Sequence, residues 1–512
     1  MNEVKDILQK MSRASKQDLA LVEKAYIFAA EAHKDHKRFS GEPYLVHLVE
    51  TARELAKLGL SAKTVAAGLL HDSVEDAGVS PETIEKEFGK EVRFLVEGVT
   101  KLGRYKYRGA ERHRESLRKL LAATGKDARV LIIKLMDRLH NMRTLAHVPE
   151  EKRQRIAQET LEIYAAIAHR LGMGAARKEL EDLAFKYAYP DEYKDTTKLL
   201  AEVSKKSTER LEIMIKTLRK ALAEDGLTHF HTDYRVKGVY SFWRKLARKE
   251  GDVARVHDIA ALRIIVRDVA DCYRALGVVH RLFQPLPNKI KDYIAFPKPN
   301  GYRSIQTSVF AGDGGIVEVQ IRTEEMHQEA EFGIASHVIY KERGAGGSER
   351  GGSSFDWVRS LLPRFKRTPN KSKADLSEMR RRNRYGAPEA SEWLAELGED
   401  VEDPDFETTL HTDIFSHRVF VFTPHGDVVD LPIEATPIDF AYAVHSDVGD
   451  HTFAAKINNK LMPLDCILEN GDIVEIQTKK SAHPTQKWLD IAKTTLARRH
   501  IRTVLEKFSK KI

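Results

Sequence analysis

The sequence predicts a multidomain protein of the α and α+β classes, in which an all-helical part precedes two mixed parts. With 512 residues the chain is too long for one core, because single domains usually contain about 100–200 residues. Up to about residue 195 apolar side chains recur at helical spacing, and strand patterns begin only after about residue 230. This order predicts a helical domain first and mixed domains after it.

The composition indicates a globular protein without a membrane span. Hydrophobic residues make up 42% of the chain and charged residues 31%. No apolar run approaches the roughly 18 residues that cross a bilayer, and the N-terminus lacks a stretch of signal-peptide type. The two cysteines, Cys272 and Cys466, can form neither a disulfide framework nor a four-cysteine zinc site. We expect a cytoplasmic protein with no membrane partner.

The positive charge is concentrated in one short tract. The formal net charge is +8, and residues 364–384 alone contribute +7 through nine Lys or Arg and two Asp or Glu. Because the rest of the chain is about neutral, the charge does not predict a general nucleic-acid binder. The tract is either a solvated linker or a contact for an RNA backbone. Its lack of interleaved aromatic residues favours the linker.

Local patterns predict the individual elements. Apolar spacing predicts helices within residues 20–34, 49–60 and 128–145. Alternation predicts strands at residues 262–266, 316–323, 418–424, 427–432 and 472–478, and residues 294–304 form a Pro/Gly-rich loop. The patterns divide the chain into a helical domain (1–195), an α/β domain (196–343), a flexible basic linker (344–407), a small sheet domain (408–480) and the start of a helical segment (481–512).

Three motifs of the helical part combine polar side chains with apolar helices. They are RFSGEPYLVH (38–47), HDSVED (71–76) and KLMDRLHNMRT (134–144). In HDSVED, helical spacing would place Glu75 one turn after His71 and Asp76 one turn after Asp72. Carboxylates this close repel one another unless a cation or solvent absorbs their charge. In the third motif, Asp137, Asn141 and Thr144 form a polar stripe on a core-like helix, and such groups need partners.

Each motif alone has an ordinary explanation, either a His-Asp surface cap or an ion-paired helix. Together they offer the mixed nitrogen and oxygen ligands that suit Mn²⁺ or another first-row divalent ion. The candidate ligands are His47, His71, Asp72 and Asp137. Such an ion could acidify a water molecule for attack on phosphorus.

These motifs resemble the hydrolase domain of the RelA/SpoT homologue family, an HD-type phosphohydrolase that removes pyrophosphate from the 3′ position of ppGpp and pppGpp. The resemblance implies that His47, His71, Asp72 and Asp137 hold Mn²⁺. It implies that Glu75 and Asp76 activate and position the attacking water, and that Arg38, Asn141 and Thr144 contact the nucleotide or its phosphates. The chain departs from the family at Ser116, where Asn is usual. The resemblance implies that this position contacts the substrate and does not belong to the metal site.

The α/β part contains a second set of polar side chains. Alternation in residues 316–323 places Glu318, Gln320 and Arg322 on one face of a strand, and Asp258 begins another strand. Carboxylates on two strands could share Mg²⁺ with a triphosphate. Cations for phosphates are Arg235, Lys237, Lys245, Lys291 and Lys298, and Tyr302 could stack on a base. Singly, each of these side chains is more often a solvated surface group.

This set resembles the synthetase domain of the same family, a nucleotidyltransferase-like fold, through KDYIAFPKPNGY (291–302) and EVQIRTEEMHQEAEFGIASH (318–337). The resemblance implies transfer of pyrophosphate from ATP to the 3′-hydroxyl of GDP or GTP, by in-line attack at the β-phosphorus. Asp258 and Glu318 would bind Mg²⁺, and Glu318 would help to deprotonate the hydroxyl. Arg235, Lys237, Lys245 and Arg263 would serve ATP, while Lys298 and Asn300 would line the guanosine site, where Tyr302 stacks on guanine.

Three positions depart from the synthetase pattern. Gln306 and Gly238 stand where the family usually has His, and Lys289 stands where Arg is common. Gln306 can still form hydrogen bonds in the nucleotide site but cannot carry a proton, so weakened synthesis is an alternative. The segment KIKD (289–292) keeps the basic character of the bifunctional members.

Residues 417–449 resemble the TGS domain, a small β-grasp-like module. In the family it helps to read uncharged tRNA on the ribosome, and His445 matches the histidine implicated in RNA binding. Alternatively, the module works only within the chain as a regulatory lid. The zinc-finger and ACT regions that usually follow do not occur in this sequence, which is either shortened or naturally short.

Three functions remain open from the sequence. The first is a bifunctional (p)ppGpp synthetase and hydrolase, which would need reciprocal control of its two sites by a conformational switch. The second is a hydrolase whose synthetase domain survives as a nucleotide sensor, as Gln306 and Gly238 indicate. The third is a regulator that mainly binds tRNA or the ribosome.

Overall fold

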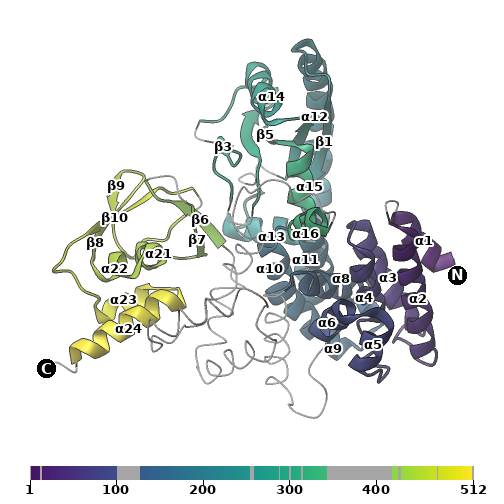
Figure 1. Ribbon diagram of the computed structural model, residues 1–512. Helices are drawn as coiled ribbons and strands as arrows, with labels where there is room; N and C mark the ends of the chain where they lie inside the picture. Colours follow the sequence, from purple (N-terminus) through teal and green to yellow (C-terminus); the bar gives the residue numbers. More distant parts are fainter. Residues whose placement is uncertain are drawn as a thin grey trace. The chain divides into compact units, whose positions relative to one another are not determined.

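The computed structural model of the chain describes residues 2–11, 14–100, 127–253, 256, 259–287, 289–298, 301–312, 315–342, 418–424, 428–469 and 471–509. The chain divides into two compact units, residues 1–96 with 132–348, and residues 97–131 with 349–512 (Figure 1). Ser116, Asp258 and Asn300 lie outside the described residues, as does the basic tract 364–384.

The regular elements described in the N-terminal part are helices, as the apolar periodicity predicts. Its elements are α1 (Asn2–Lys10), α2 (Lys16–Ala32), α3 (Leu45–Lys57), α4 (Ala62–Leu70), α5 (Pro81–Phe88), α6 (Lys90–Val99), α8 (Arg129–Arg143), the 3-10 helix η1 (Leu145–His147), α9 (Glu150–Glu159), the π-helix η2 (Thr160–Tyr164), α10 (Ala165–Arg170), α11 (Gly174–Ala188) and α12 (Pro190–Glu224). The last of these helices continues past residue 195 without a break and extends into the α/β part.

The helix α4 is the apolar centre of this part and positions two site residues. Nearly all of its side chains are buried. Gly68 allows the close packing against α3, because a Cβ at this position would collide with the side chain of Leu55. The approach brings the C-terminal end of α4, where His71 follows, close to His47 on α3.

HDSVED does not form the regular helix that its expected spacing assumes, although Asp76 does lie one turn after Asp72. The helix α4 ends at Leu70, and residues 71–76 form turns. The imidazole Nδ1 of His71 lies 2.8 Å from the carbonyl oxygen of Gly68 and so occupies an acceptor of the last helical turn. One helix-like hydrogen bond remains, from the amide of Asp76 to the carbonyl of Asp72 at 2.8 Å. The turns allow His71 and Asp72 to face the same point, which a regular helix does not allow for adjacent residues.

The α/β part contains a five-stranded sheet in the order β1-β2-β5-β4-β3. Its strands are β1 (Phe230–Val236), β2 (Ala260–Val266), β3 (Lys291–Asp292), β4 (Ile305–Phe310) and β5 (Ile316–Thr323), and its helices are α13 (Val239–Arg248), α14 (Val269–Leu282), α15 (Glu324–Phe332) and α16 (Ile334–Glu342). Among the strand pairs described in this sheet, β2 and β5 run parallel and the others antiparallel. The strands predicted at residues 262–266 and 316–323 are confirmed.

Alternation on β5 separates a core face from a polar face, as predicted. Val317, Val319 and Ile321 are buried in one hydrophobic cluster with α14 and the C-terminal half of α12. In Figure 1, α12 and α14 lie beside the strands of this sheet. Glu318 and Gln320 are half-buried on the opposite face. Arg322 differs from this pattern because its side chain is fully buried.

The second unit contains the small C-terminal domain. Its described elements are β6 (Arg418–Phe422), β7 (Val428–Pro432), α21 (Pro437–Val444), α22 (Ser446–Asp450), β8 (Thr452–Ile457), β9 (Lys460–Met462), β10 (Val474–Thr478), α23 (Gln486–Ile491) and α24 (Thr495–Ser509). The sheets β10-β8-β9 and β6-β7 are joined by a parallel bridge between Phe422 and Ile473. The buried carboxylate of Asp439 caps α21 and accepts hydrogen bonds from the backbone amides of Lys493 and Thr494.

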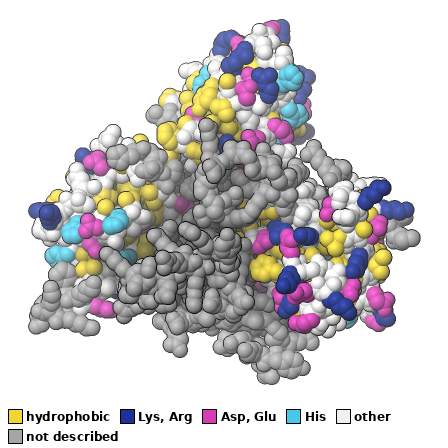
Figure 2. All heavy atoms as spheres, viewed as in Figure 1, with side chains coloured by type: hydrophobic (Ala, Val, Ile, Leu, Met, Phe, Trp, Pro, Cys, Tyr) yellow, Lys and Arg dark blue, Asp and Glu magenta, His cyan; other side chains and the backbone are white. Residues whose placement is uncertain are grey.

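The described surface carries mixed charge. On the face in Figure 2, basic and acidic side chains are interspersed over the helices of the first unit. Among the described residues, no helix is both long and apolar enough to cross a membrane.

Candidate active sites

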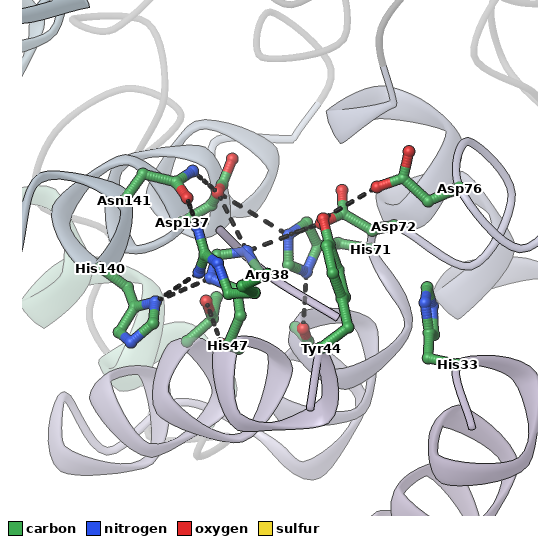
Figure 3. A network of polar contacts seen from close by, with 12 residues as sticks. His33, Arg38, Tyr44, His47, His71, Asp72, Asp76, Asp137, His140 and Asn141 are labelled. Carbon is green, nitrogen blue, oxygen red and sulfur yellow. Dashed lines mark hydrogen bonds and ion pairs between the residues drawn. The ribbon is translucent and has the colours of Figure 1, made fainter. Parts of the chain in front are cut away.

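Four predicted metal ligands converge in the helical part (Figure 3). His47 lies on α3, His71 and Asp72 follow α4, and Asp137 lies on α8. The Nε2 atom of His47 lies 3.5 Å from Asp72 Oδ2 and 3.3 Å from Asp137 Oδ1. The Nε2 atom of His71 lies 3.1 Å from Asp72 Oδ2 and 3.9 Å from Asp137 Oδ1. Both imidazoles therefore direct the same nitrogen toward the same pair of carboxylates.

Burial gives this cluster strong electrostatic coupling. His47, His71 and Asp137 are buried, and Asp72 is half-buried. Burial opposes the charge of Asp72, but the neighbouring imidazoles hold its pKa well below the ordinary value. Burial also opposes the charge of His71, but the adjacent Asp72 raises the pKa of that imidazole to about 9. The carboxylates therefore favour positive charge between them, which a proton or a metal cation can supply.

The donor set fits a divalent metal ion. The Nδ1 atom of His71 contacts a carbonyl oxygen, which can only accept, so Nδ1 carries a proton and neutral His71 presents its Nε2 lone pair. This buried Nε2 has no hydrogen bond of acceptable geometry within the described part of the chain. One ligand atom from each of His47, His71 and Asp137 lies within 4.8 Å of the other two. Two imidazoles with carboxylates are a typical set for a first-row divalent ion.

Asp76 lies beside the cluster and shares a phenol with it. The hydroxyl of Tyr44 lies 2.8 Å from Oδ2 of Asp72 and 2.8 Å from Oδ2 of Asp76. Because a hydroxyl has one proton, Tyr44 can donate to only one of them at a time. Asp76 is exposed, so it can meet a water or substrate next to the metal ligands. Glu75 lies half-buried in the same turns, and its catalytic role remains a prediction.

The structure brings two of the three predicted substrate contacts to the metal cluster. Arg38 donates to Oδ1 of Asn141 and to Nδ1 of His140, and Asn141 in turn donates to Oδ1 of Asp137. Thr144 follows the end of α8, and its hydroxyl donates to the carbonyl of His140 at 3.1 Å. Arg38 and Asn141, which are predicted to contact the substrate, are thus linked by hydrogen bonds to the candidate metal ligand Asp137.

Three contributors were missed by the sequence prediction, namely Tyr44, Lys134 and His140. Buried Lys134 lies 2.8 Å from Asp137 Oδ2; burial opposes its charge, but Asp137 raises its pKa. Burial and the neighbouring His47 and Arg38 lower the pKa of His140 to about 3. Each of the three lies three positions from a predicted ligand on a helix or at its start, so their spacing was the available signal.

Five of the predicted synthetase residues line a cavity of about 370 Å³ in the first unit. It is lined by Arg235, Lys237, Lys298, Tyr302 and Glu318 from the predicted set, with Gly238 and Gln320. The helix α11 contributes Arg177, Lys178 and Glu181, which the sequence prediction missed. Lys245 is half-buried on α13, and Lys291 is exposed on β3. One wall of this cavity therefore belongs to the helical part.

A chain of hydrogen bonds orients the carboxylate of Glu318. Arg322 donates to Oε1 of Gln320 at 2.6 Å, and Nε2 of Gln320 donates to Oε1 of Glu318 at 2.7 Å. Since a guanidinium only donates and a carboxylate only accepts, the amide of Gln320 has one favourable orientation. Glu318 is thereby held in the pocket with one oxygen engaged.

The aromatic and basic groups of the loop contact one another at the pocket. The ammonium of Lys298 lies 5.1 Å from the ring centroid of Tyr302 and 4.6 Å from that of Tyr293. Gln306 donates to the hydroxyl of Tyr302 at 2.8 Å. Gln306 therefore fixes the tyrosine by a hydrogen bond that does not need the proton-carrying capacity of a histidine.

The predicted ATP ligands Arg235 and Arg263 share one acidic partner. Their guanidinium groups lie 3.5 Å and 3.3 Å from Oε1 of Glu331 on α15. Arg263 is buried on β2 and also lies 3.7 Å from Asp233. A nucleotide phosphate would compete with these carboxylates for the two arginines.

The glycine at position 238 has a structural explanation that the sequence did not reveal. It precedes α13, and Asp182 of α11 caps that helix by accepting a hydrogen bond from the amide of Tyr240 at 3.1 Å. A Cβ at residue 238 would lie 2.7 Å and 2.8 Å from the two carboxylate oxygens of Asp182. Glycine therefore makes room for a cap that comes from the helical part.

We expect Gly238→Ala to lower the free energy of unfolding by about 1 kcal/mol, because the Asp182 carboxylate must leave the helix N-terminus. In an Asp182→Ala background the same change should cost much less. Gly277→Ala on α14 is the matched control, since nothing lies near its added Cβ, and it should stabilise the protein slightly. Calorimetric unfolding of the four variants provides the measurement. Equal losses in both backgrounds would contradict the proposed clash.

His445 lies in the second unit, between α21 and α22. It is exposed, and its Nδ1 accepts a hydrogen bond from the amide of Asp447 at 3.1 Å. The side chain therefore caps α22 and leaves its other nitrogen toward the surface. A role in RNA binding remains a prediction.

Three segments of the chain match known domain families. Residues 25–174 match the HD domain, residues 234–345 match the region found in RelA/SpoT proteins, and residues 419–478 match the TGS domain. These matches agree with the order of domains expected from the motifs.

Curated relatives align with nearly the whole chain. It is 42% identical over 501 residues to the guanosine-3′,5′-bis(diphosphate) 3′-pyrophosphohydrolase of Aquifex aeolicus (strain VF5), covering 98% of this chain and 66% of the relative. It is 42% identical over 493 residues to the GTP pyrophosphokinase of Myxococcus xanthus, covering 95% and 60%. It is 39% identical over 483 residues to the bifunctional (p)ppGpp synthase/hydrolase SpoT of Escherichia coli (strain K12), covering 94% and 64%.

The chain thus spans about 60–66% of the length of these relatives. Its helical HD part, its α/β part and its small sheet domain follow one another as the three domain matches require. On this similarity, the chain belongs to the RelA/SpoT homologue family.

Proposed function

We propose that this chain is a bifunctional alarmone enzyme of the stringent response, which makes (p)ppGpp from ATP and GDP or GTP and hydrolyses it again. The convergence of His47, His71, Asp72 and Asp137 carries the hydrolase half of the proposal. The cavity that holds Glu318 among cations carries the synthetase half. The names of these relatives include both activities, which supports the combination.

In the hydrolase site, the four ligands would hold Mn²⁺, which supplies an acidified water when bound. Asp76, assisted by Glu75, would accept the proton of that water, because Asp76 is exposed and contacts the same phenol as Asp72. Arg38 and Asn141 would orient the 3′-pyrophosphate beside the ligands. Water adds to phosphorus, the ester oxygen departs with a proton, and the products are GDP or GTP and pyrophosphate.

In the synthetase site, Glu318 would accept the proton of the 3′-hydroxyl as its oxygen attacks the β-phosphorus of ATP. A bond from the 3′-oxygen to that phosphorus forms, the bond to the bridging oxygen breaks, and AMP leaves. Glu318 and Asp258 would hold Mg²⁺. Arg235, Lys237 and the α11 side chains Arg177 and Lys178 line the same cavity and would neutralise phosphate charge. Tyr302 would stack on guanine, with Lys298 over its ring.

The charge of Lys298 predicts how nucleotide binding depends on pH. Burial, assisted by Lys291 and Arg177, lowers the pKa of this lysine to about 8. Its protonated form binds phosphate and predominates below that pH, so KM for GDP should rise by up to about tenfold per pH unit above it. Lys298→Arg keeps its charge and should flatten the profile. Initial rates of synthesis between pH 7 and 9 measure the effect. An equally steep rise in the arginine variant would assign it to another group.

The TGS domain supports the proposal that a partner binds away from the two active sites. We propose that it contacts uncharged tRNA on the ribosome in the cytoplasm, with His445 on the contacting surface. The match to the TGS domain and the exposure of His445 support this assignment. Salt-dependent tRNA binding that His445→Ala weakens is the expected result.

The decisive experiment measures both reactions with the same purified chain. With ATP, Mg²⁺ and labelled GDP or GTP, a 3′-pyrophosphorylated product should appear. With Mn²⁺ and labelled ppGpp, pyrophosphate should be released. Release without any synthesis, even with ribosomes and uncharged tRNA, would instead favour a hydrolase whose synthetase domain senses nucleotides. Strong tRNA binding without either reaction would favour a regulator.

A further inference from the structure

His140 joins the proposed metal site through a ring-to-ring contact (Figure 3). It lies on α8 one turn after Asp137, and only 6% of its surface is exposed. Its Nδ1 lies 2.8 Å from Nδ1 of His47 and 3.0 Å from a guanidinium nitrogen of Arg38. Two imidazole nitrogens at this distance share one hydrogen atom, so one of them donates and the other accepts.

Arg38 decides the direction of that hydrogen bond. A guanidinium has donors only, so Nδ1 of His140 must be an acceptor. His140 therefore carries its proton on Nε2, and Nδ1–H of His47 donates to it. A neutral His47 with its proton on Nδ1 has its lone pair on Nε2, which is the atom 3.3 Å from Asp137 and 3.5 Å from Asp72. The contact selects the tautomer of His47 that can bind a metal.

The two histidine ligands reach the same tautomer by different routes. His71 donates from Nδ1 to the carbonyl of Gly68, three residues earlier in the chain. His47 donates to a residue 93 positions later. The ligand state of His71 is therefore fixed locally, whereas that of His47 depends on how α8 packs against α3. Loss of His140 should affect His47 while leaving the route used by His71 intact.

We infer that His140 is a positioning residue of the metal site, which fixes the tautomer and ring plane of His47 through a hydrogen bond that Arg38 orients. The inference rests on the proposed metal site. Residues that hold metal ligands in this way typically contribute about 10- to 100-fold to metal affinity. His140 does not touch the metal or the substrate in this role.

Mn²⁺ affinity of the full chain, measured by the electron paramagnetic resonance of free Mn²⁺, tests the inference without relying on activity. His140→Ala should weaken binding about 10- to 100-fold. His140→Asn should retain most of the affinity, because its Oδ1 can accept in place of Nδ1. His147→Ala, which removes an exposed histidine after α8, is the matched control and should bind as the wild type does.

His140→Leu separates the effect of the lost hydrogen bond on Mn²⁺ affinity from the effect of an unfilled buried space. It fills most of the space but offers no acceptor, so it should bind Mn²⁺ as weakly as His140→Ala. If the alanine variant fails to fold, the comparison of Leu with Asn decides the same question. Wild-type affinity in the Leu variant, or equal weakness of Leu and Asn, would overturn the inference. Equal Mn²⁺ binding by the wild type and Asp72→Asn would instead refute the metal site itself, and the role of His140 with it.

Discussion

Asp72→Asn is expected to reduce Mn²⁺-dependent release of pyrophosphate from ppGpp by at least about a thousandfold. Asp72 lies within 3.5 Å of the Nε2 atoms of both His47 and His71. An asparagine removes the negative charge that attracts the cation and can place an NH₂ group against those nitrogens. Because a bound metal lowers the pKa of water from about 15.7 to about 7, losing the ion removes several powers of ten of nucleophile at neutral pH.

The measurement is the rate of pyrophosphate release at saturating ppGpp over a series of Mn²⁺ concentrations. Asp195→Asn is the matched control, since Asp195 is exposed on α12 in the same unit, and it should leave the rate unchanged. Synthesis by the Asp72→Asn chain should persist, because the synthetase cavity is lined by other residues. Full hydrolysis by this variant would show that the metal site is misassigned.

Glu318→Gln is expected to lower synthesis of (p)ppGpp by about 10²- to 10⁴-fold, the usual contribution of a general base. Glutamine keeps the size of the side chain but can accept no proton at neutral pH and binds Mg²⁺ weakly. The hydrogen bond from Gln320 positions the carboxylate and cannot replace its charge. Hydrolysis should be unaffected, since none of the predicted hydrolase ligands lies on the synthetase sheet.

This rate is best measured in an Asp72→Asn background, so that hydrolysis does not remove the product. Labelled GDP or GTP with ATP and Mg²⁺ gives the initial rate. The control is Glu325→Gln, an exposed glutamate in the first turn of α15, which should synthesise normally. A Glu318→Gln chain that keeps the control rate would exclude Glu318 as the base and would leave the proposed hydrolase site untouched.

The two variants together test whether two independent sites exist on one chain. Each variant should lose one reaction and keep the other. The predicted ligands of the hydrolase site lie on α3, α8 and the turns after α4, whereas Glu318 lies on β5. Loss of both reactions in either variant would indicate that the two sites share residues or a common conformational requirement.

Much of the fold was predictable because local periodicity reflects burial. Apolar spacing in residues 128–145 predicted α8, and alternation in residues 316–323 predicted β5 with Glu318 on its polar face. A regular helix was not formed at HDSVED, where α4 ends at Leu70 and the imidazole of His71 contacts the carbonyl oxygen of Gly68. Such a contact depends on the position of one imidazole, which periodicity does not encode.

The sequence also predicted the four candidate metal ligands that the structure brings together, because the residue types that bind a divalent ion are few and occur in recognisable motifs. It did not identify their supports. Lys134, Tyr44 and His140 are ordinary helix residues until packing places each against a ligand. From the sequence, Gly238 was interpreted as a departure from the family motif. In the structure, its lack of a Cβ leaves room for the carboxylate of Asp182.

The sequence by itself therefore indicated the family and the helical and α/β parts, and it predicted the chemical type of each site. Only the tertiary structure shows which ring nitrogen of each candidate ligand histidine faces a hydrogen-bond partner, which carboxylate oxygen Lys134 contacts, and that α11 forms one wall of the cavity that holds Glu318. The physical reason is the separation along the chain over which each kind of interaction acts. Burial patterns act between neighbours on one helix or strand, whereas the direction of a hydrogen bond between His47 and His140 depends on atoms brought together across 93 positions of chain.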